Sequence, residues 1–286
     1  MQNFTDLNSR APPPPYNSQS VLEKYDITGI FAQKLNQLQG FKIVCICDDS
    51  TSMRETLNKG QTKWDELKQS IEIVLEIGAS YNVDCDVLFL NRPGFRSVKH
   101  ISQLSQQFSR PPEGRTPLTK CFQLALEINR QVLKERKLLV LIFTDGCPTC
   151  DYGNPIKEFK EALECRNPMN RIFVSIVACT DDVNALRYLN KWDKTIPNLD
   201  VVDDYESEKK EIYNARKFIG AFTYGDYIAK ILLGSFVIQI DELDEADPED
   251  QEEFDDLPDL NCFDIPFVVL FIIFIVFIIS KLPNPQ

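Results

Sequence analysis

Histidine is nearly absent from this sequence: His100 is the only one among 286 residues. Acid–base catalysis that depends on histidine would have to use His100, which lies in a polar stretch where a surface position is expected. The G-x-S-x-G, H-E-x-x-H and phosphate-loop motifs of hydrolases, metalloproteases and nucleotide-binding proteins are also missing. The sequence therefore predicts a protein that is not an enzyme.

A secretory signal is missing as well, because the first 30 residues contain no basic start followed by an apolar run. The nine cysteines are an odd number, and several stand in apolar runs where a buried thiol is expected. Both observations favour a reduced domain in the cytosol. The C-x-x-C pair Cys147 and Cys150 has no second pair to complete a zinc site, so it is either a redox dithiol or two incidental loop cysteines.

Negative charge is concentrated in one segment. The chain carries 43 acidic and 31 basic residues, and residues 241–260 hold 12 of the acidic ones with no Lys or Arg. The rest of the chain is therefore neutral and offers no basic face for nucleic acid. We expect residues 241–260 to be a disordered linker that is extended by its own charge repulsion.

The beginning of the chain is also unlike a globular domain in composition. Residues 1–20 are polar and rich in proline, which predicts a disordered arm. Within this arm, Pro13, Pro14 and Tyr16 form a PPxY motif, and WW domains bind such preformed polyproline segments. The alternative is that residues 1–20 form a stiff disordered tail that no WW domain recognises.

Residues 265–280, in contrast, are almost entirely Phe, Ile, Leu and Val. At about 1.5 Å per residue they would span ~24 Å, slightly less than a hydrocarbon core of about 30 Å. We therefore expect a single transmembrane helix at residues 263–282 that anchors the chain by its tail. The domain would then face the cytosol, on a host membrane or in a virion if the protein is viral. The alternative is a buried core helix, which the acidic linker disfavours.

Residues 21–240 alternate between apolar, β-rich runs and helical patterns, as βαβ units do. This alternation predicts an α/β domain of three layers, with a doubly wound (Rossmann-like), mostly parallel central β-sheet flanked by helices. The expected strands are 41–47, 83–90, 138–143, 172–178 and 199–202, with a short edge strand at 95–98. The expected helices are 26–38 with Asp26 as its cap, 64–75, 118–132, one beginning at Asn154-Pro155, 182–192 and 224–238.

Polar residues follow two of these strands and precede one helix. They are Asp48, Ser50 and Ser52 in a D-x-S-x-S pattern, Thr116 before a helix, and Asp145 in Thr144-Asp145-Gly146. In an open parallel sheet such positions meet at the carboxyl edge, and ligands bind there at the reversal of strand order. Carboxylates and hydroxyls are the oxygen ligands that Mg²⁺ or Mn²⁺ prefers. The pattern therefore predicts a divalent-metal site.

In this order and at these separations, the three groups resemble the metal-ion-dependent adhesion site of von Willebrand factor A domains and integrin I domains. The resemblance covers residues 40–240. It implies that Ser50, Ser52 and Thr116 ligate the ion through hydroxyls, whereas Asp48 and Asp145 act directly or through water. It also implies that a partner protein supplies an Asp or Glu to the remaining coordination position. One residue departs from the family pattern, because Thr51 stands where glycine is common.

Two other interpretations stay open at this point. A response-regulator-like receiver would use Asp48 and Asp49 to hold Mg²⁺ beside a phosphoacceptor aspartate, although that fold is shorter than this domain and leaves the hydroxyls unexplained. In the second interpretation, the domain is a metal-free structural component of a membrane or virion. A phosphatase of the haloacid dehalogenase class is excluded, because Ser50 stands where its second aspartate is needed.

Overall fold

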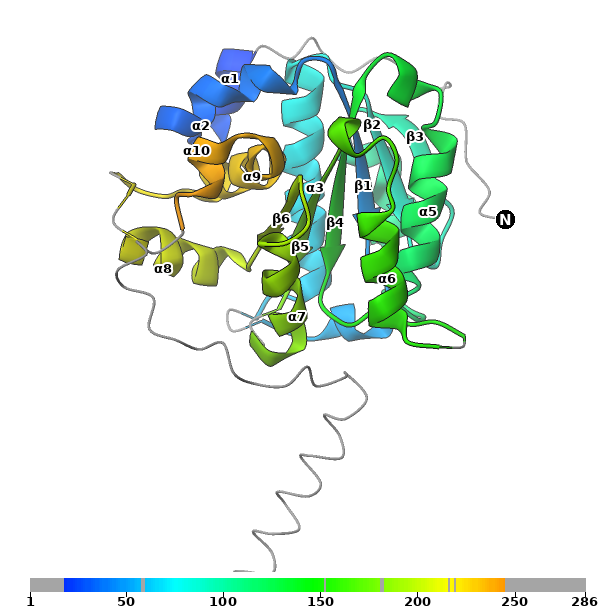
Figure 1. Ribbon diagram of the computed structural model, residues 1–286. Helices are drawn as coiled ribbons and strands as arrows, with labels where there is room; N and C mark the ends of the chain where they lie inside the picture. The colour runs from blue at the N-terminus through cyan, green and yellow to red at the C-terminus, as the bar shows by residue number, and fades with distance from the viewer. Residues whose placement is uncertain are drawn as a thin grey trace, which may run out of the picture. The chain divides into compact units, whose positions relative to one another are not determined.

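A six-stranded sheet in the order β3-β2-β1-β4-β5-β6 forms the centre of the fold (Figure 1). The computed structural model describes residues 18–57, 60–151, 153–180, 183–215, 217–218 and 220–244. Neighbouring strands are parallel except for β2 and β3, which pair antiparallel at the edge. The strands are β1 (Phe41–Cys47), β2 (Cys85–Phe89), β3 (Phe95–Val98), β4 (Lys137–Thr144), β5 (Ile172–Ala178) and β6 (Leu199–Val202).

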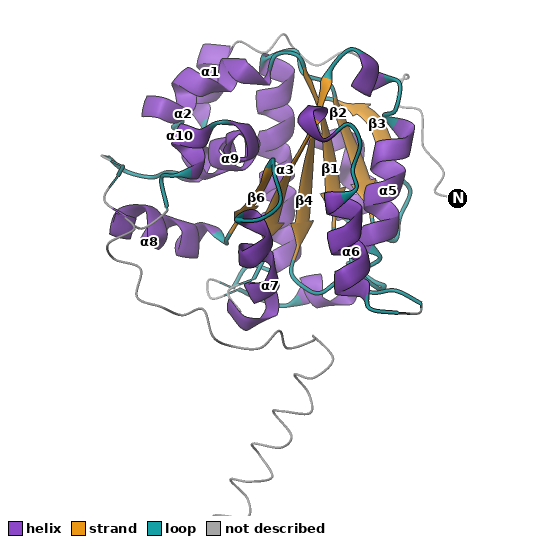
Figure 2. Ribbon diagram, in the orientation of Figure 1, coloured by secondary structure: helices purple, strands orange, loops and turns teal. Residues whose placement is uncertain are grey.

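Helices cover both faces of the sheet, as Figure 2 shows. The α-helices are α1 (Ser18–Lys24), α2 (Gly29–Lys34), α3 (Lys63–Ser80), α4 (Ser105–Phe108), α5 (Leu118–Ile128), α6 (Pro155–Glu164), α7 (Val183–Asp193), α8 (Tyr205–Ala215), α9 (Tyr224–Leu233) and α10 (Ile238–Asp241). Short 3₁₀ turns are η1 (Leu35–Leu38), η2 (Thr51–Arg54), η3 (Ile101–Leu104), η4 (Val132–Lys134), η5 (Met169–Arg171) and η6 (Gly234–Phe236).

The side chains of the inner strands alternate between two hydrophobic cores, because successive residues of a strand point to opposite faces. Ile43 and Cys45 of β1 belong to the core that also contains residues of α3 and α9. Val44 and Ile46 belong to the core formed with α5 and α6. Burial on both faces explains why these strands are continuous apolar runs. The predicted three-layer α/β class is therefore confirmed.

The predicted strands agree with the structure to within two residues, and Asn154 caps α6 by accepting from Lys157 N–H at 3.1 Å. Helix ends differ more. Thr28, not Asp26, is the N-cap of α2, because Asp26 adopts a left-handed conformation with φ 51°. The helices expected at 26–38 and 118–132 each divide into an α-helix and a 3₁₀ turn, and the one expected at 224–238 divides into α9, η6 and the start of α10.

Helical structure is present in places where the composition predicted disorder. α1 begins at Ser18, inside the expected arm of residues 1–20, and it was not predicted. α10 ends at Asp241, and the following Leu243 is buried although it lies in the expected linker. Asp244 lies 3.4 Å from Lys230, so the first residues of the acidic segment pack on the domain. The described helices and contacts thus extend beyond residues 21–240 at each end.

Candidate metal centre

The candidate metal centre lies at the carboxyl edge of the sheet, between β1 and β4. Strand order reverses here, because β1 to β3 extend the sheet in one direction and β4 to β6 extend it in the other (Figure 1). Asp48 follows β1 directly, and its backbone N–H donates to the carbonyl of Phe143 at 2.9 Å. Asp145 directly follows β4. The sheet itself therefore brings together the two loops with the predicted carboxylates.

Three of the predicted ligands form a continuous series of oxygen contacts. Ser50 Oγ lies 3.1 Å from Ser52 Oγ, and Ser52 Oγ donates to Asp145 Oδ1 at 2.8 Å. Ser50 and Asp145 are buried, whereas Ser52 is exposed. Two hydroxyls and a carboxylate thus converge where the loop meets solvent, and this is a donor set that suits a hard divalent cation.

Asp48 is fully buried at the base of the same loop. Its Oδ1 accepts from Ser50 N–H at 2.8 Å, and its Oδ2 accepts from Thr144 Oγ1 at 2.7 Å. Burial raises the pKa of Asp48 to about 6, although the hydrogen bonds from Ser50 and Thr144 act in the opposite direction. Because both oxygens are engaged, Asp48 suits a role through water, or in shaping the loop, better than direct ligation.

The loop that contains Thr116 joins the centre just before α5. Gly114 in this loop has φ 124°, a conformation that favours glycine, and its carbonyl accepts from Thr51 N–H at 3.3 Å. Thr116 N–H donates to Thr149 Oγ1 at 3.0 Å, and Thr116 O accepts from Thr149 N–H at 2.8 Å. Thr116 is therefore held through its backbone in the adjacent loop, while Ser50, Ser52 and Asp145 make the direct oxygen contacts.

Thr51, the residue that departs from the family pattern, fits the loop without strain. It opens η2, a right-handed turn that residues other than glycine adopt readily. Its side chain is exposed, and its Oγ1 accepts from Gly114 N–H at 3.3 Å. The threonine thus adds a contact between the first and second loops of the centre.

A lysine that the sequence patterns did not single out contacts the centre. Lys63, the first residue of α3, places Nζ 2.9 Å from Asp145 Oδ2 and 2.6 Å from Glu55 Oε2. Lys63 is buried. Burial alone would lower the pKa of Lys63, but hydrogen bonds to Glu55 and Asp145 raise it above its ordinary value. Asp145 therefore directs one oxygen to Ser52 and the other to a protonated amine.

The only local signal for Lys63 is the capping box whose two residues, Thr62 and Asp65, lie on either side of it. Thr62 Oγ1 accepts from Asp65 N–H at 3.1 Å, and an Asp65 carboxylate oxygen accepts from Thr62 N–H at 3.2 Å. This pattern locates the start of the helix. It does not indicate that the start of the helix faces Asp145, which is 82 positions further along the chain.

Asp49, beside Asp48, holds the neighbouring loops together. Its Oδ1 accepts from the backbone N–H and the Nδ2 of Asn91 at 2.8 and 3.0 Å, and its Oδ2 lies 3.0 Å from Arg92 Nε. Arg92 donates in turn to the carbonyls of Gln107 and Arg110 at 2.6 and 3.1 Å. Asp49 is thus engaged through both oxygens, and neither Asn91 nor Arg92 was predicted.

Among the residues that the structure describes, one further group of carboxylates could hold a metal ion. Oxygens of Glu208, Glu211 and Asp244 lie within 4.8 Å of one another. Lys230 is buried beside them, with Nζ 3.0 Å from Glu208 Oε1 and 3.4 Å from Asp244 Oδ2. Burial raises the pKa of Glu208 and of Glu211. Lys230 supplies this cluster with an internal positive charge.

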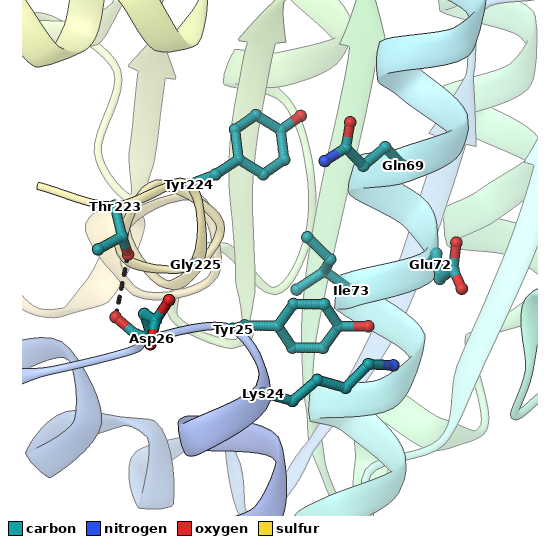
Figure 3. A pocket seen from close by; sticks show the side chains of 9 residues that line it. All are labelled: Lys24, Tyr25, Asp26, Gln69, Glu72, Ile73, Thr223, Tyr224 and Gly225. Atoms are coloured by element: carbon teal, nitrogen blue, oxygen red, sulfur yellow. Dashed lines mark hydrogen bonds between the residues drawn. The ribbon is translucent and has the colours of Figure 1, made fainter.

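A pocket of about 380 Å³ lies elsewhere, between the turn after α1, the middle of α3 and the start of α9 (Figure 3). Tyr25 and Tyr224 both line it, and Tyr224 OH lies 2.8 Å from Ser70 Oγ. Thr223 Oγ1 donates to the carbonyl of Asp26 at 3.0 Å, the bond drawn dashed in Figure 3. None of the five predicted metal ligands lines this pocket, so it is separate from the candidate metal centre.

His100 has a local structural role. Its Nδ1 accepts from Ser102 N–H at 3.1 Å and caps η3. Cys147 and Cys150 are both half-buried in the loop that follows β4. Whether the pair has a redox role stays a prediction.

Several predictions fall outside the described residues: the PPxY motif of Pro13, Pro14 and Tyr16, the transmembrane helix at 263–282, and most of the acidic linker. Within the described part of the chain, the structure contains no helix with the length and apolar character needed to cross a membrane. Comparison with protein-family models and with curated proteins yields no match for this chain.

Proposed function

We propose that this chain is a membrane-tethered von Willebrand factor A-like domain that binds a protein partner through a divalent ion. Mg²⁺ or Mn²⁺ would be held by Ser50, Ser52, Thr116 and Asp145, with Asp48 acting through water. The single observation that carries the proposal is the contact of Ser52 Oγ with Asp145 Oδ1, because it joins the loops after β1 and β4 through two oxygen ligands.

The position of the centre also supports binding of a ligand. Doubly wound sheets bind ligands at the carboxyl ends of the strands where strand order reverses, and the centre lies at this point. Ser52 is exposed, whereas Ser50 and Asp145 beneath it are buried. A partner can therefore approach the ion from the Ser52 side.

The proposed action is non-covalent. An Asp or Glu of the partner would complete the coordination of the ion, so the affinity for the partner would depend both on the metal and on that carboxylate. No group of this chain needs to exchange a proton or form a covalent bond. The protein would act in interaction or scaffolding and not in catalysis.

Calorimetric titration of the full chain in detergent with Mn²⁺ tests the proposal. We expect one saturable site in the wild type and its loss in Asp145→Ala. Asp151→Ala is the matched control, because Asp151 is an exposed carboxylate that pairs with Arg115 and Lys120 near the same edge. Absence of Mn²⁺ binding by the folded wild type, or equal binding by Asp145→Ala, contradicts the proposal.

One observation favours a second candidate function, a metal-free structural domain. The amine of Lys63 already neutralises Asp145, so the centre has a counter-ion of its own. This candidate predicts no heat of Mn²⁺ binding at millimolar ion, together with unchanged stability in chelator. The same titration therefore separates the two functions. The receiver interpretation has less support, because Asp48 and Asp49 each use both oxygens within the protein.

The membrane tether is tested separately, by deleting residues 262–286. The apolar composition of residues 265–280 supports the proposal. We expect the full chain to stay with membranes after carbonate extraction and the shortened chain to be released. Retention of the shortened chain in the membrane pellet would refute the anchor.

Binding of a WW domain to the PPxY arm is tested with Tyr16→Ala in the full chain.

A further inference from the structure

We propose that Lys63 is a tethered cation that competes with the divalent ion for Asp145 and sets the affinity of the centre. This inference rests on the proposed function, because it concerns regulation of the same site. The amine reaches Asp145 from α3, an element that carries none of the predicted ligands.

The contacts of Asp145 show why the two cations compete. Asp145 Oδ1 faces Ser52 at 2.8 Å, and Asp145 Oδ2 faces Lys63 Nζ at 2.9 Å. The predicted ligands include two carboxylates, Asp48 and Asp145, and the ammonium group offsets one of these charges. Because like charges repel, a divalent ion near Asp145 is disfavoured as long as the amine stays in place.

Glu55 gives the amine a second position. Lys63 Nζ lies 2.6 Å from Glu55 Oε2, and the Glu55 side chain is 66% exposed, whereas that of Asp145 is 1% exposed. The backbone N–H of Lys63 also donates to the carbonyl of Glu55 at 3.0 Å, so the start of α3 stays close to Glu55. When an ion binds, the amine can release Asp145 and keep its contact with Glu55.

The two partners of Lys63 therefore have opposite effects. Asp145 holds the amine in the centre, and Glu55 draws it toward solvent. Removing the lysine charge strengthens ion binding. Removing the Glu55 charge weakens ion binding, because the amine then pairs with Asp145 alone.

Mn²⁺ titration of the full chain in detergent tests this competition in four proteins: wild type, Lys63→Met, Lys63→Arg and Glu55→Gln. We expect Lys63→Met to bind Mn²⁺ about tenfold more tightly or better, since it removes a unit charge close to a divalent ion. Lys63→Arg keeps the charge and is the matched control, with an affinity near the wild type. Glu55→Gln should bind more weakly than the wild type. Its substitution is at an exposed side chain, so it tests the proposal even if Lys63→Met fails to fold.

Thermal unfolding provides a second measurement. Without metal, Lys63→Met leaves the Asp145 carboxylate buried without its counter-charge, so this variant should unfold at a lower temperature than the wild type. Added Mn²⁺ should raise its unfolding temperature more than that of the wild type. A purely structural ion pair would give the first effect without the second.

The outcomes separate this inference from the proposed function. If the wild type binds Mn²⁺ and Lys63→Met binds no more tightly, the competition is refuted and the metal function stands. If only Lys63→Met binds, the competition stands and the wild type is not a metal-dependent domain. If neither folded protein binds, both are refuted.

Discussion

Ser52 Oγ donates a hydrogen bond to Asp145 Oδ1 at 2.8 Å, although the two residues are 93 positions apart in the sequence. The contact exists because β1 and β4 are neighbours in the sheet, with Cys47 paired to Phe143 at their ends. Ser52 is exposed and Asp145 is buried. The proposed ligand Ser52 can therefore be replaced with little effect on the core.

We expect Ser52→Ala to weaken Mn²⁺ binding by at least about tenfold, which is the lower range for groups that support a metal site. The free energy of unfolding without metal should change little, because the side chain is exposed. Thr51→Ser, in the same exposed loop, is the control and should retain Mn²⁺ affinity, because it keeps the hydroxyl that contacts Gly114. Calorimetry and urea unfolding measure the two quantities. Equal affinities of Ser52→Ala and the wild type would remove Ser52 from the ligand set.

Replacing Lys230 with Met should destabilise the domain by about 3–5 kcal/mol, the usual cost of removing one partner of a buried ion pair. Lys230 and Glu208 lie 3.0 Å apart with side chains that are both 1% exposed. The control is Lys157→Met, because Lys157 and Glu161 are exposed and 3.8 Å apart. An exposed pair of this kind contributes about 0.5 kcal/mol or less. Urea unfolding compares the variants, and similar losses for both would contradict this prediction.

Gly225→Ala should also destabilise the domain, by about 1–3 kcal/mol, as overpacking of a core does. An added Cβ at Gly225 would lie 2.0 Å from the carbonyl oxygen of Tyr25, so α9 or the turn after α1 must move. Gly78 in α3 is the matched control, because its Cβ would meet Val83 O at an ordinary 3.5 Å. Gly78→Ala should be neutral or stabilising, since alanine favours a helix by about 1 kcal/mol over glycine. If Gly78→Ala has a lower melting temperature than Gly225→Ala, the distances from an added Cβ to its neighbours do not determine the stability of these variants.

Stability should fall as the pH rises from about 4 to about 7 because of Asp193. Burial raises the pKa of Asp193 to about 7. The folded state therefore binds this proton more tightly than the unfolded state, so the stabilising effect is present at low pH and is lost as the pH rises through 7. One such group contributes at most about 1.4 kcal/mol per pH unit. Urea unfolding of the wild type across this range measures the slope.

Asp193→Asn isolates this effect from the other buried carboxyl groups. The amide can still accept the hydrogen bond that Asp193 Oδ1 accepts from Val201 N–H at 3.1 Å. We expect the variant to have a shallower slope than the wild type. Asp151→Asn is the control, because contacts with Lys120 and Arg115 lower the pKa of Asp151 and place its titration outside this range. An unchanged slope in Asp193→Asn would exclude Asp193 as the source.

The strands were predictable because burial on both faces requires continuous apolar runs, such as 41–47 and 172–178, which match β1 and β5 in full. Helix ends were less predictable, since they depend on neighbours. At Gly234, which follows α9, an added Cβ would lie 1.9 Å from Asp200 Oδ2, so a residue of β6 packs where the helix ends. α1 was missed because Val21 is its only buried residue and gives no periodic stripe.

The sequence by itself determined the class of the fold and the order of Asp48, Ser50, Ser52, Thr116 and Asp145 along it, because strand periodicity and short-range spacing are local properties. It did not determine which side chains touch. The tertiary structure decided that Ser52 meets Asp145, that Asp49 is engaged by Asn91 and Arg92, and that Lys63 neutralises Asp145. These contacts join residues 42 to 93 positions apart. Pairing of the strands and packing of α3 on the sheet bring them together, and no local pattern encodes that geometry.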